Sequence, residues 1–191
     1  MYLRLMAAVF TIIMITASIG NIMGIFDFFK GKGKQPELTA SGSYDVSIPE
    51  ERFICADVRI DGKPHVCVLN ESLMKVTPKE PFRWYLSLIM NFENTVGDDM
   101  PDKDDTVKMQ DFIEYLCNHL AADSKHPNSI FLGRVTGNGE TQAMWYVNNP
   151  GLANAFLQSL ISSGKFPFHF EFVMEEDPDW NEAHYWLDPL L

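Results

Sequence analysis

Hydrophobic residues follow two different spacings between residues 82 and 174, and the order of these spacings predicts the elements of a domain. Residues 82–92 and 168–174 alternate their apolar positions, as a strand does when its two faces meet different surroundings. Two shorter apolar runs, residues 130–135 and 141–147, flank the sequence Gly137-Asn138-Gly139, which suits the positive backbone angles of a tight turn. These four segments are predicted to be strands, and the middle two are predicted to form a hairpin.

Helical spacing fills the two gaps between these strands. The first predicted helix has apolar residues three and four positions apart, namely Met109, Phe112, Ile113, Leu116, Cys117 and Leu120. Asp105 or Thr106 is expected to cap its first turn. The second predicted helix follows Asn149-Pro150, a capping residue before a proline, and ends at Gly164. Its inward residues are expected to be Leu152, Ala153, Phe156, Leu157 and Leu160.

The resulting order, strand-helix-strand-strand-helix-strand, predicts an α+β fold of the ferredoxin-like split type. Right-handed crossovers would place these four strands in the spatial order 4-1-3-2, with both helices on one face of the sheet. An earlier hairpin, residues 53–59 and 65–69 around Asp61-Gly62, is expected to extend the sheet. After Asp177-Pro178 a short C-terminal helix is predicted, with Trp180, Ala183, His184 and Leu187 on one side.

The amino terminus has three interpretations, which the sequence leaves open. Residues 5–19 are apolar and follow Arg4, which is typical of a secretory signal peptide. The same segment, prolonged toward residue 29, is also long enough for a membrane anchor. Alternatively, translation begins at Met23 and the protein is cytoplasmic, whereas a signal or anchor would place it in the envelope or outside the cell. Residues 23–43 are expected to be a flexible linker, and residues 44–191 a single α+β domain.

The charge balance excludes one class of partner. The chain has 26 Asp and Glu residues against 15 Lys and Arg residues, a net charge of −11. This excess disfavours nucleic acid and anionic lipid, so a membrane is expected to matter only through residues 1–22. The three cysteines, Cys55, Cys67 and Cys117, form no C-x-x-C pair and indicate neither a zinc site nor a disulfide framework. Whether Cys55 and Cys67 meet depends on strand parity, which the sequence does not give.

Catalytic and cofactor signatures are missing from the sequence. It has no G-x-S-x-G elbow, Walker loop, G-x-G-x-x-G after a strand or H-E-x-x-H helix, so no cofactor and no metal are expected and catalytic residues are not assigned. The acidic loop of residues 98–105 lacks the glycine and the bidentate glutamate that a calcium loop requires. It is expected to be a solvated loop that leads into the first helix.

The sheet face turned away from the helices is the predicted interaction surface. Its candidate residues are Tyr85, Ser87, Ile89, Asn91, Tyr146, His169 and Trp180. An open apolar face flanked by acidic residues favours a non-enzymatic protein-binding or regulatory module, or self-association. The competing interpretation of this surface is that the C-terminal helix covers it. Two other functions stay open: a small hydrolase or ligand-binding enzyme that uses His184 or His169 with carboxylates of the C-terminal segment, and an envelope-anchored structural protein.

Three short motifs carry a family resemblance. They are residues 133–139 (GRVTGNG), residues 145–147 (WYV) and residues 176–180 (EDPDW). With them, residues 52–190 resemble the bacterial family catalogued as domain of unknown function 695. The resemblance implies no activity, substrate, cofactor or catalytic residue. Some members of the family are joined to a domain similar to a protein regulator of ribonuclease E, which is itself ferredoxin-like, and this analogy points to regulation through protein–protein contact.

Overall fold

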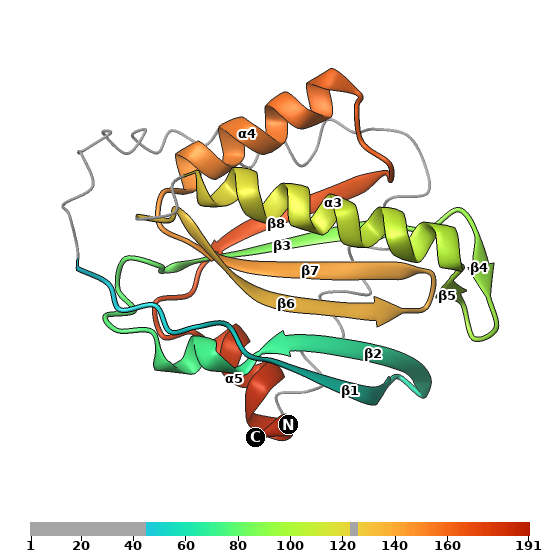
Figure 1. Ribbon diagram of the computed structural model, residues 1–191, viewed down its shortest axis with the longest axis horizontal. Helices are drawn as coiled ribbons and strands as arrows, with labels where there is room; N and C mark the ends of the chain where they lie inside the picture. Colours follow the sequence, from blue (N-terminus) through green and yellow to red (C-terminus); the bar gives the residue numbers. More distant parts are fainter. Residues whose placement is uncertain (1–44, 123–125) are drawn as a thin grey trace. The chain divides into compact units, whose positions relative to one another are not determined.

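A six-stranded antiparallel sheet forms the centre of the domain in the computed structural model, which describes residues 45–122 and 126–191 (Figure 1). The spatial order of the strands is β1-β2-β6-β7-β3-β8. Their bounds are β1 (Phe53–Ile60), β2 (Lys63–Asn70), β3 (Trp84–Asn91), β6 (Ser129–Gly137), β7 (Glu140–Val147) and β8 (Phe170–Glu176). A separate two-stranded sheet joins β4 (Thr95–Val96) to β5 (Met100–Pro101). The predictions for residues 1–22 and 23–43 lie outside the described residues.

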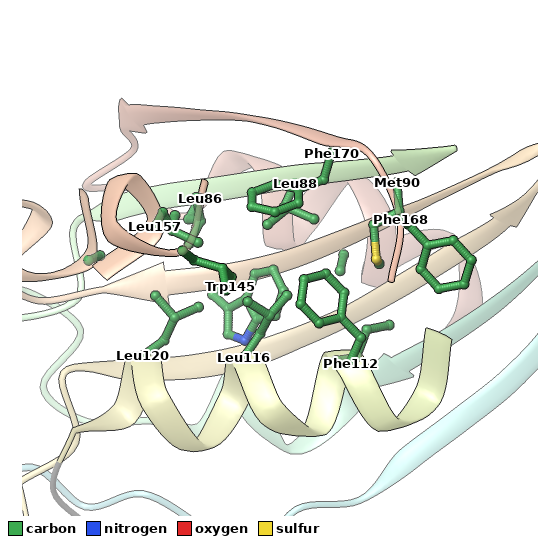
Figure 2. Close-up of a cluster of buried hydrophobic side chains, with 14 of the residues drawn as sticks. Leu86, Leu88, Met90, Phe112, Leu116, Leu120, Trp145, Leu157, Phe168 and Phe170 are labelled. Carbon is green, nitrogen blue, oxygen red and sulfur yellow. The ribbon is translucent and has the colours of Figure 1, made fainter. Parts of the chain in front are cut away.

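Two long helices, α3 (Lys103–Ala121) and α4 (Pro150–Ser163), lie side by side on one face of the sheet (Figure 1). Their apolar stripes bury the alternate residues of the central strands between helix and sheet, as Figure 2 shows. The centre of this first core consists of Leu86, Leu88, Met90, Phe112, Leu116, Trp145, Leu157 and Phe170. Burial of this apolar area is the main favourable contribution to folding.

The other face of the sheet is covered by shorter elements: η1 (Glu71–Lys75), α5 (Asn181–Leu187) and η2 (Asp188–Leu190). They enclose a second core, which is formed by the strand residues whose side chains point away from α3 and α4. This core includes Leu69, Tyr85, Leu132, Met144, Tyr146, Trp180 and Leu187. The central strands are therefore buried on both faces. This arrangement explains why consecutive residues of both strands are buried: Leu86, Ser87 and Leu88 in β3, and Met144, Trp145 and Tyr146 in β7.

The predicted α+β class is confirmed, with an N-terminal hairpin joined to the sheet and a short C-terminal helix. The hairpin turn has positive φ at Asp61 (51°) and Gly62 (80°), as the Asp-Gly sequence predicted. Among the helices of residues 45–122 and 126–191, none is both long and apolar enough to cross a membrane.

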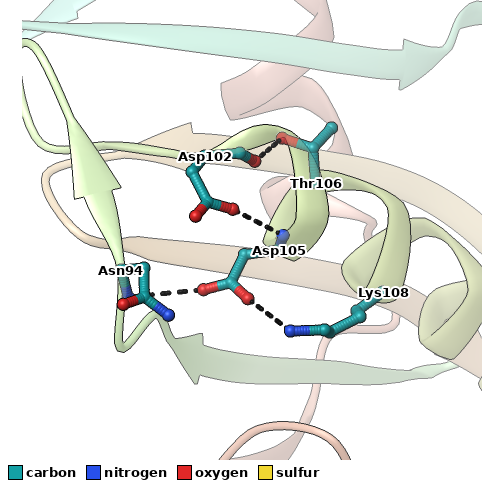
Figure 3. A network of polar contacts seen from close by, with 5 residues as sticks. All are labelled: Asn94, Asp102, Asp105, Thr106 and Lys108. Carbon is teal, nitrogen blue, oxygen red and sulfur yellow. Dashed lines mark hydrogen bonds and ion pairs between the residues drawn. The ribbon is translucent and has the colours of Figure 1, made fainter.

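Two details of the helices differ from the prediction. Leu152, predicted to face inward, is 52% exposed, because the buried stripe of α4 runs through Ala153, Leu157 and Leu160. The cap of α3 is Asp102, not Asp105 or Thr106: its carboxylate accepts a hydrogen bond from the backbone N–H of Asp105 at 2.8 Å (Figure 3).

Asp105 has a different role from the predicted cap. Its buried carboxylate accepts a hydrogen bond from the backbone N–H of Asn94 at 3.3 Å and pairs with Lys108 at 3.0 Å (Figure 3). The side-chain hydrogen bond from Lys108 to Asp105, together with the charge of that carboxylate, raises the pKa of Lys108. In the acidic loop, the Asp102 carboxylate thus caps the start of α3, and the Asp105 carboxylate holds the segment around Asn94, which follows β3, against this helix.

Candidate functional site

The layer of helices is narrower than the sheet beneath it. Packed helices lie about 8–10 Å apart and neighbouring strands about 4.8 Å apart, so two helices cover about four strands. The cores place α3 and α4 over β6, β7, β3 and β8. In the described part of the chain, β1 and β2 therefore have no helix on this side, and the aromatic side chain of Phe53 on β1 remains 42% exposed.

A groove runs along the open side of α3, with a volume of about 740 Å³. The helix wall of the groove consists of residues three and four positions apart, which are Gln110, Ile113, Glu114, Cys117, Asn118 and Ala121. Ile48, Glu51 and Phe53 form the opposite wall. The floor is made by side chains of β2, β6 and β7, which are Val68, Phe131, Arg134 and Trp145. The groove has the size of ordinary ligand pockets and is largely apolar.

Aromatic rings connect the wall and the floor of the groove. The ring centroids of Phe53 and Phe131 are 6.2 Å apart, and those of Phe131 and Trp145 are 5.2 Å apart. The indole Nε1 of Trp145 donates a hydrogen bond to Sγ of Cys117 at 3.4 Å. Burial raises the pKa of the Cys117 thiol to about 11, so the thiol is protonated at neutral pH and is a poor nucleophile.

A β-bulge in β6 brings the one basic residue of the floor to this face. Phe131 is opposite Trp145 and Gly133 is opposite Met144, so Leu132 is an extra residue in β6. In a regular strand, Phe131 and Arg134 would point to opposite faces, because side chains alternate and these two residues are three positions apart. With the bulge, both side chains line the groove.

The Arg134 guanidinium is half-buried and has no carboxylate partner within 4 Å among the residues that the structure describes. Among the described residues, its Nη1 donates to Sδ of Met109, at 3.5 Å, which is a weak acceptor. Burial lowers the pKa of Arg134, but an arginine remains charged in proteins. Glu51 and Glu114 are exposed on the rims, so the largely apolar groove has one cation at its floor and one carboxylate on each rim.

The predicted interaction surface on the opposite face is largely covered. Tyr85, Ser87, Tyr146 and Trp180 are buried in the core beneath α5 and η1, so these four residues are not an open surface. Ile89 is half-buried, and Asn91 and His169 are exposed. At these four positions the structure agrees with the competing interpretation, in which the C-terminal helix covers this face. The physical reason is that Trp180, Ala183 and Leu187 are apolar and are buried against the sheet.

The motif residues of this covered face hold the C-terminal helix in place. The hydroxyl of Tyr146 donates to Oδ2 of Asp177 at 2.7 Å, and Asp177 also accepts from the backbone N–H groups of Asn181 (2.8 Å) and Glu182 (2.9 Å). The Trp180 ring stacks on Tyr146 with centroids 4.2 Å apart, and its Nε1 donates to the carbonyl of Phe82 at 2.8 Å. These residues satisfy one another and leave no reactive group directed into the groove.

The enzyme hypothesis used His184 or His169 with carboxylates of the C-terminal segment, and of these two histidines His184 lies within hydrogen-bond distance of one. Nδ1 of His184 is 3.2 Å from the carboxylate of Asp188, and both side chains are exposed, so His184 does not share the buried side of α5 with Ala183 and Leu187 as predicted. His169 precedes β8 and Asp177 follows it, so a strand of 7 residues separates them by roughly 20 Å. In residues 45–122 and 126–191 no group of three or more His, Cys, Asp or Glu side chains is placed to hold a metal ion.

The groove and Arg134 were missed in the sequence. One signal was present: Arg134 is the only charged residue of β6 and follows directly on the apolar run of residues 130–132. A second signal was the count of elements, since a hairpin added to a four-stranded sheet leaves two strands more than two helices cover.

The chain matches one protein family, described as "Family of unknown function (DUF695)", over residues 54–187. The match includes the groove floor and the Tyr146–Asp177 contact and stops at the end of α5. No curated protein and no solved structure matches the chain.

Proposed function

The chain belongs to the family of unknown function DUF695, and we propose that its domain is a non-enzymatic protein-binding module that accepts an amphipathic helix of a partner in the groove beside α3. The observation that supports this function most directly is the missing helix over β1 and β2 in the described residues. A helix laid there would continue the layer of α3 and α4 over the whole six-stranded sheet. This is the helix-in-groove mode of peptide recognition.

The lining of the groove fits the apolar face of such a helix. Phe53 and Ile48 are 42% and 37% exposed on the wall opposite α3, and both line the same groove as the apolar floor residues, so one apolar helix face would cover them together. Val68, Phe131 and Trp145 supply the apolar and aromatic part of the floor beside Arg134. Aromatic anchors in a concave site supply most of the affinity in helix-binding grooves.

The negative charge of this protein favours basic residues on either side of the apolar face of the partner helix. The chain has a net charge of −11, and Glu51 and Glu114 are on the two rims of the groove. A partner helix with Lys or Arg beside its apolar face would therefore associate faster, and the association would slow as salt increases.

The fold that carries the groove is, in our proposal, the ferredoxin-like split β-α-β-β-α-β motif with the hairpin β1–β2 added at one edge. The order β8-β3-β7-β6 and the position of α3 and α4 on one face support it. In this arrangement the added hairpin widens the sheet without adding a helix, and the groove is a direct result.

Site-specific photo-crosslinking tests the proposed function. A benzoylphenylalanine placed at Phe53 reports on the groove, and one at Val173, which is 50% exposed on β8, reports on a different apolar surface position. We expect position 53, but not position 173, to crosslink in cells to one helical segment of another protein. The purified segment should then bind the full chain at least 10-fold more weakly when Phe53→Glu is introduced, and Val173→Glu should bind normally.

Two results of this experiment would overturn the proposal. Equal crosslinking at positions 53 and 173 would show no preference for the groove. A crosslink at position 53 only to a second copy of the chain would make the groove a self-association surface instead.

A further inference from the structure

We infer that the partner helix carries an Asp or Glu within its apolar face and that Arg134 pairs with this carboxylate. The inference rests on the proposed function, because it assigns the chemistry of the helix that occupies the groove. It concerns one contact at the floor, between the Arg134 guanidinium and one acidic side chain of the partner.

The first step is that Arg134 has unused hydrogen-bonding capacity. A guanidinium has five N–H donors, and the only acceptor that the described residues offer to the Arg134 side chain is Sδ of Met109. The carboxylates of the groove, Glu51 and Glu114, are more than 4 Å from it. Its remaining donors are satisfied by water only while the groove is open to solvent.

The second step concerns what happens when a helix fills the groove. An apolar helix face over Arg134 would remove that water and leave a buried charge without a partner, which is strongly unfavourable. A carboxylate at that point replaces the water with a charge-assisted and often bidentate pair. The occupant must therefore be acidic at one position and apolar around it.

The third step is that the position of Arg134 is built into the backbone. The bulge at Leu132 turns Arg134 to the groove face, and Gly133 next to it allows β2 to approach closely: a Cβ there would be 2.3 Å from the carbonyl oxygen of Val68. The guanidinium is thus held between α3 and the hairpin β1–β2. A fixed cation selects one register of the bound helix, because only one residue of its apolar face is opposite Arg134.

A displayed library of helical peptides tests the inference with defined probes. The library varies all positions of one helix face and is selected against the full chain. We expect the selected peptides to carry Asp or Glu at one fixed position of their apolar face. Changing that residue from Glu to Gln should weaken binding to the native chain by 10- to 100-fold.

The matched variant is Arg134→Gln, with Arg134→Lys as a second variant that keeps the charge but loses the planar fork. With Arg134→Gln, peptides with Glu and with Gln should bind within about 2-fold of each other, and Arg134→Lys should retain part of the preference. The Glu-to-Gln change in the peptide leaves the protein untouched, so it remains decisive if a variant folds poorly.

The outcomes separate this inference from the proposed function. Suppose that the selected peptides lose binding when Phe53→Glu is introduced. The role of Arg134 alone would then be overturned by either of two results: the peptides carry no fixed acidic residue, or they keep their preference for Glu with Arg134→Gln. A library that yields no peptide sensitive to Phe53→Glu would overturn the helix-binding function, and the inference with it.

Discussion

The hydroxyl of Tyr146 donates a hydrogen bond to Oδ2 of Asp177 at 2.7 Å and accepts one from the backbone N–H of Ala183 at 3.1 Å. Tyr146 belongs to β7 in the middle of the sheet, and Asp177 and Ala183 belong to the start of the C-terminal helical segment. One buried hydroxyl therefore fixes the helix α5 to the sheet through two hydrogen bonds. The second core depends on this attachment, because α5 is its outer cover.

Removing the hydroxyl with Tyr146→Phe should lower the free energy of unfolding by about 1–3 kcal/mol, because the Asp177 carboxylate and the Ala183 N–H both lose a buried partner. Urea unfolding of the full chain followed by tryptophan fluorescence measures this difference. Tyr185→Phe is the matched control, since Tyr185 is 57% exposed and its loss should change the unfolding free energy by less than about 0.5 kcal/mol. Equal effects of the two substitutions would contradict the role of the Tyr146 hydroxyl.

Acid should weaken the same attachment. Burial alone raises the pKa of Asp177, but hydrogen bonds from the backbone of Glu182, from Tyr146 and from Asn181 outweigh it and hold the pKa below its usual value. A carboxyl group whose pKa is lower in the folded state contributes stability above its unfolded pKa of about 4, and the contribution is lost as the pH falls through the folded pKa.

The Asp177→Asn variant removes this contribution, and titrating groups away from Asp177 are unchanged between the two chains. Glu182 acts in the opposite sense, because burial and the neighbouring charge of Asp177 raise its pKa. We therefore expect the difference in unfolding free energy between the native chain and Asp177→Asn to shrink as the pH is lowered from about 6 to about 2. A difference that stays constant over this range would contradict the assignment.

Much of the fold was predictable because local signals and the fold agree. The Asp61-Gly62 turn, the Asn149 cap with Pro150 and the left-handed Gly164 all occur where the sequence placed them. Such positions depend on backbone conformation within a few residues. The prediction that Leu152 faces inward was wrong for the opposite reason. The face that a helix buries is decided by the elements it packs on, and these are far away in the sequence.

The candidate site was harder to predict, because it depends on a single extra residue. Strict alternation in β6 assigns Phe131 and Arg134 to opposite faces, and only the bulge at Leu132 reverses one of them. The covered face was the second difficulty. Tyr85 and Tyr146 have the parity of an open face, and the short helix that buries them is attached by contacts between Tyr146 and Asp177, 31 residues apart in sequence.

Gly133 should be intolerant of any side chain. Its φ is +145°, and a Cβ at this position would meet the carbonyl oxygen of Val68 at 2.3 Å and Cα of Leu69 at 2.8 Å. Both neighbours are backbone atoms of β2, so relief requires β2 and β6 to separate. Gly133→Ala should therefore lower the free energy of unfolding by more than about 3 kcal/mol.

Gly97→Ala is the control for this substitution, because a Cβ at Gly97 meets no atom within 4 Å. Thermal unfolding of both variants provides the comparison, and Gly97→Ala should unfold within a few degrees of the native chain. If Gly133→Ala were as stable as Gly97→Ala, the close approach of β2 to β6 at the bulge would be wrong.

The three cysteines should differ sharply in reactivity, and this difference tests the register of the hairpin. Cys55 is opposite Val68 and Cys67 is opposite Ala56, so the two thiols point to opposite faces of the sheet and cannot form a disulfide. Cys55 is exposed, whereas burial raises the pKa of Cys67 and of Cys117 to about 11. At pH 8 only about one in a thousand of the Cys67 and Cys117 thiols is ionised, and the thiolate is the reactive form.

An aromatic disulfide reagent should therefore modify one thiol quickly in the native chain and all three in urea, and Cys55→Ser should abolish the fast phase. A second fast thiol, or a disulfide between Cys55 and Cys67 after mild oxidation of the folded chain, would mean that the pairing of β1 with β2 is shifted by one residue, which would also turn Phe53 away from the groove.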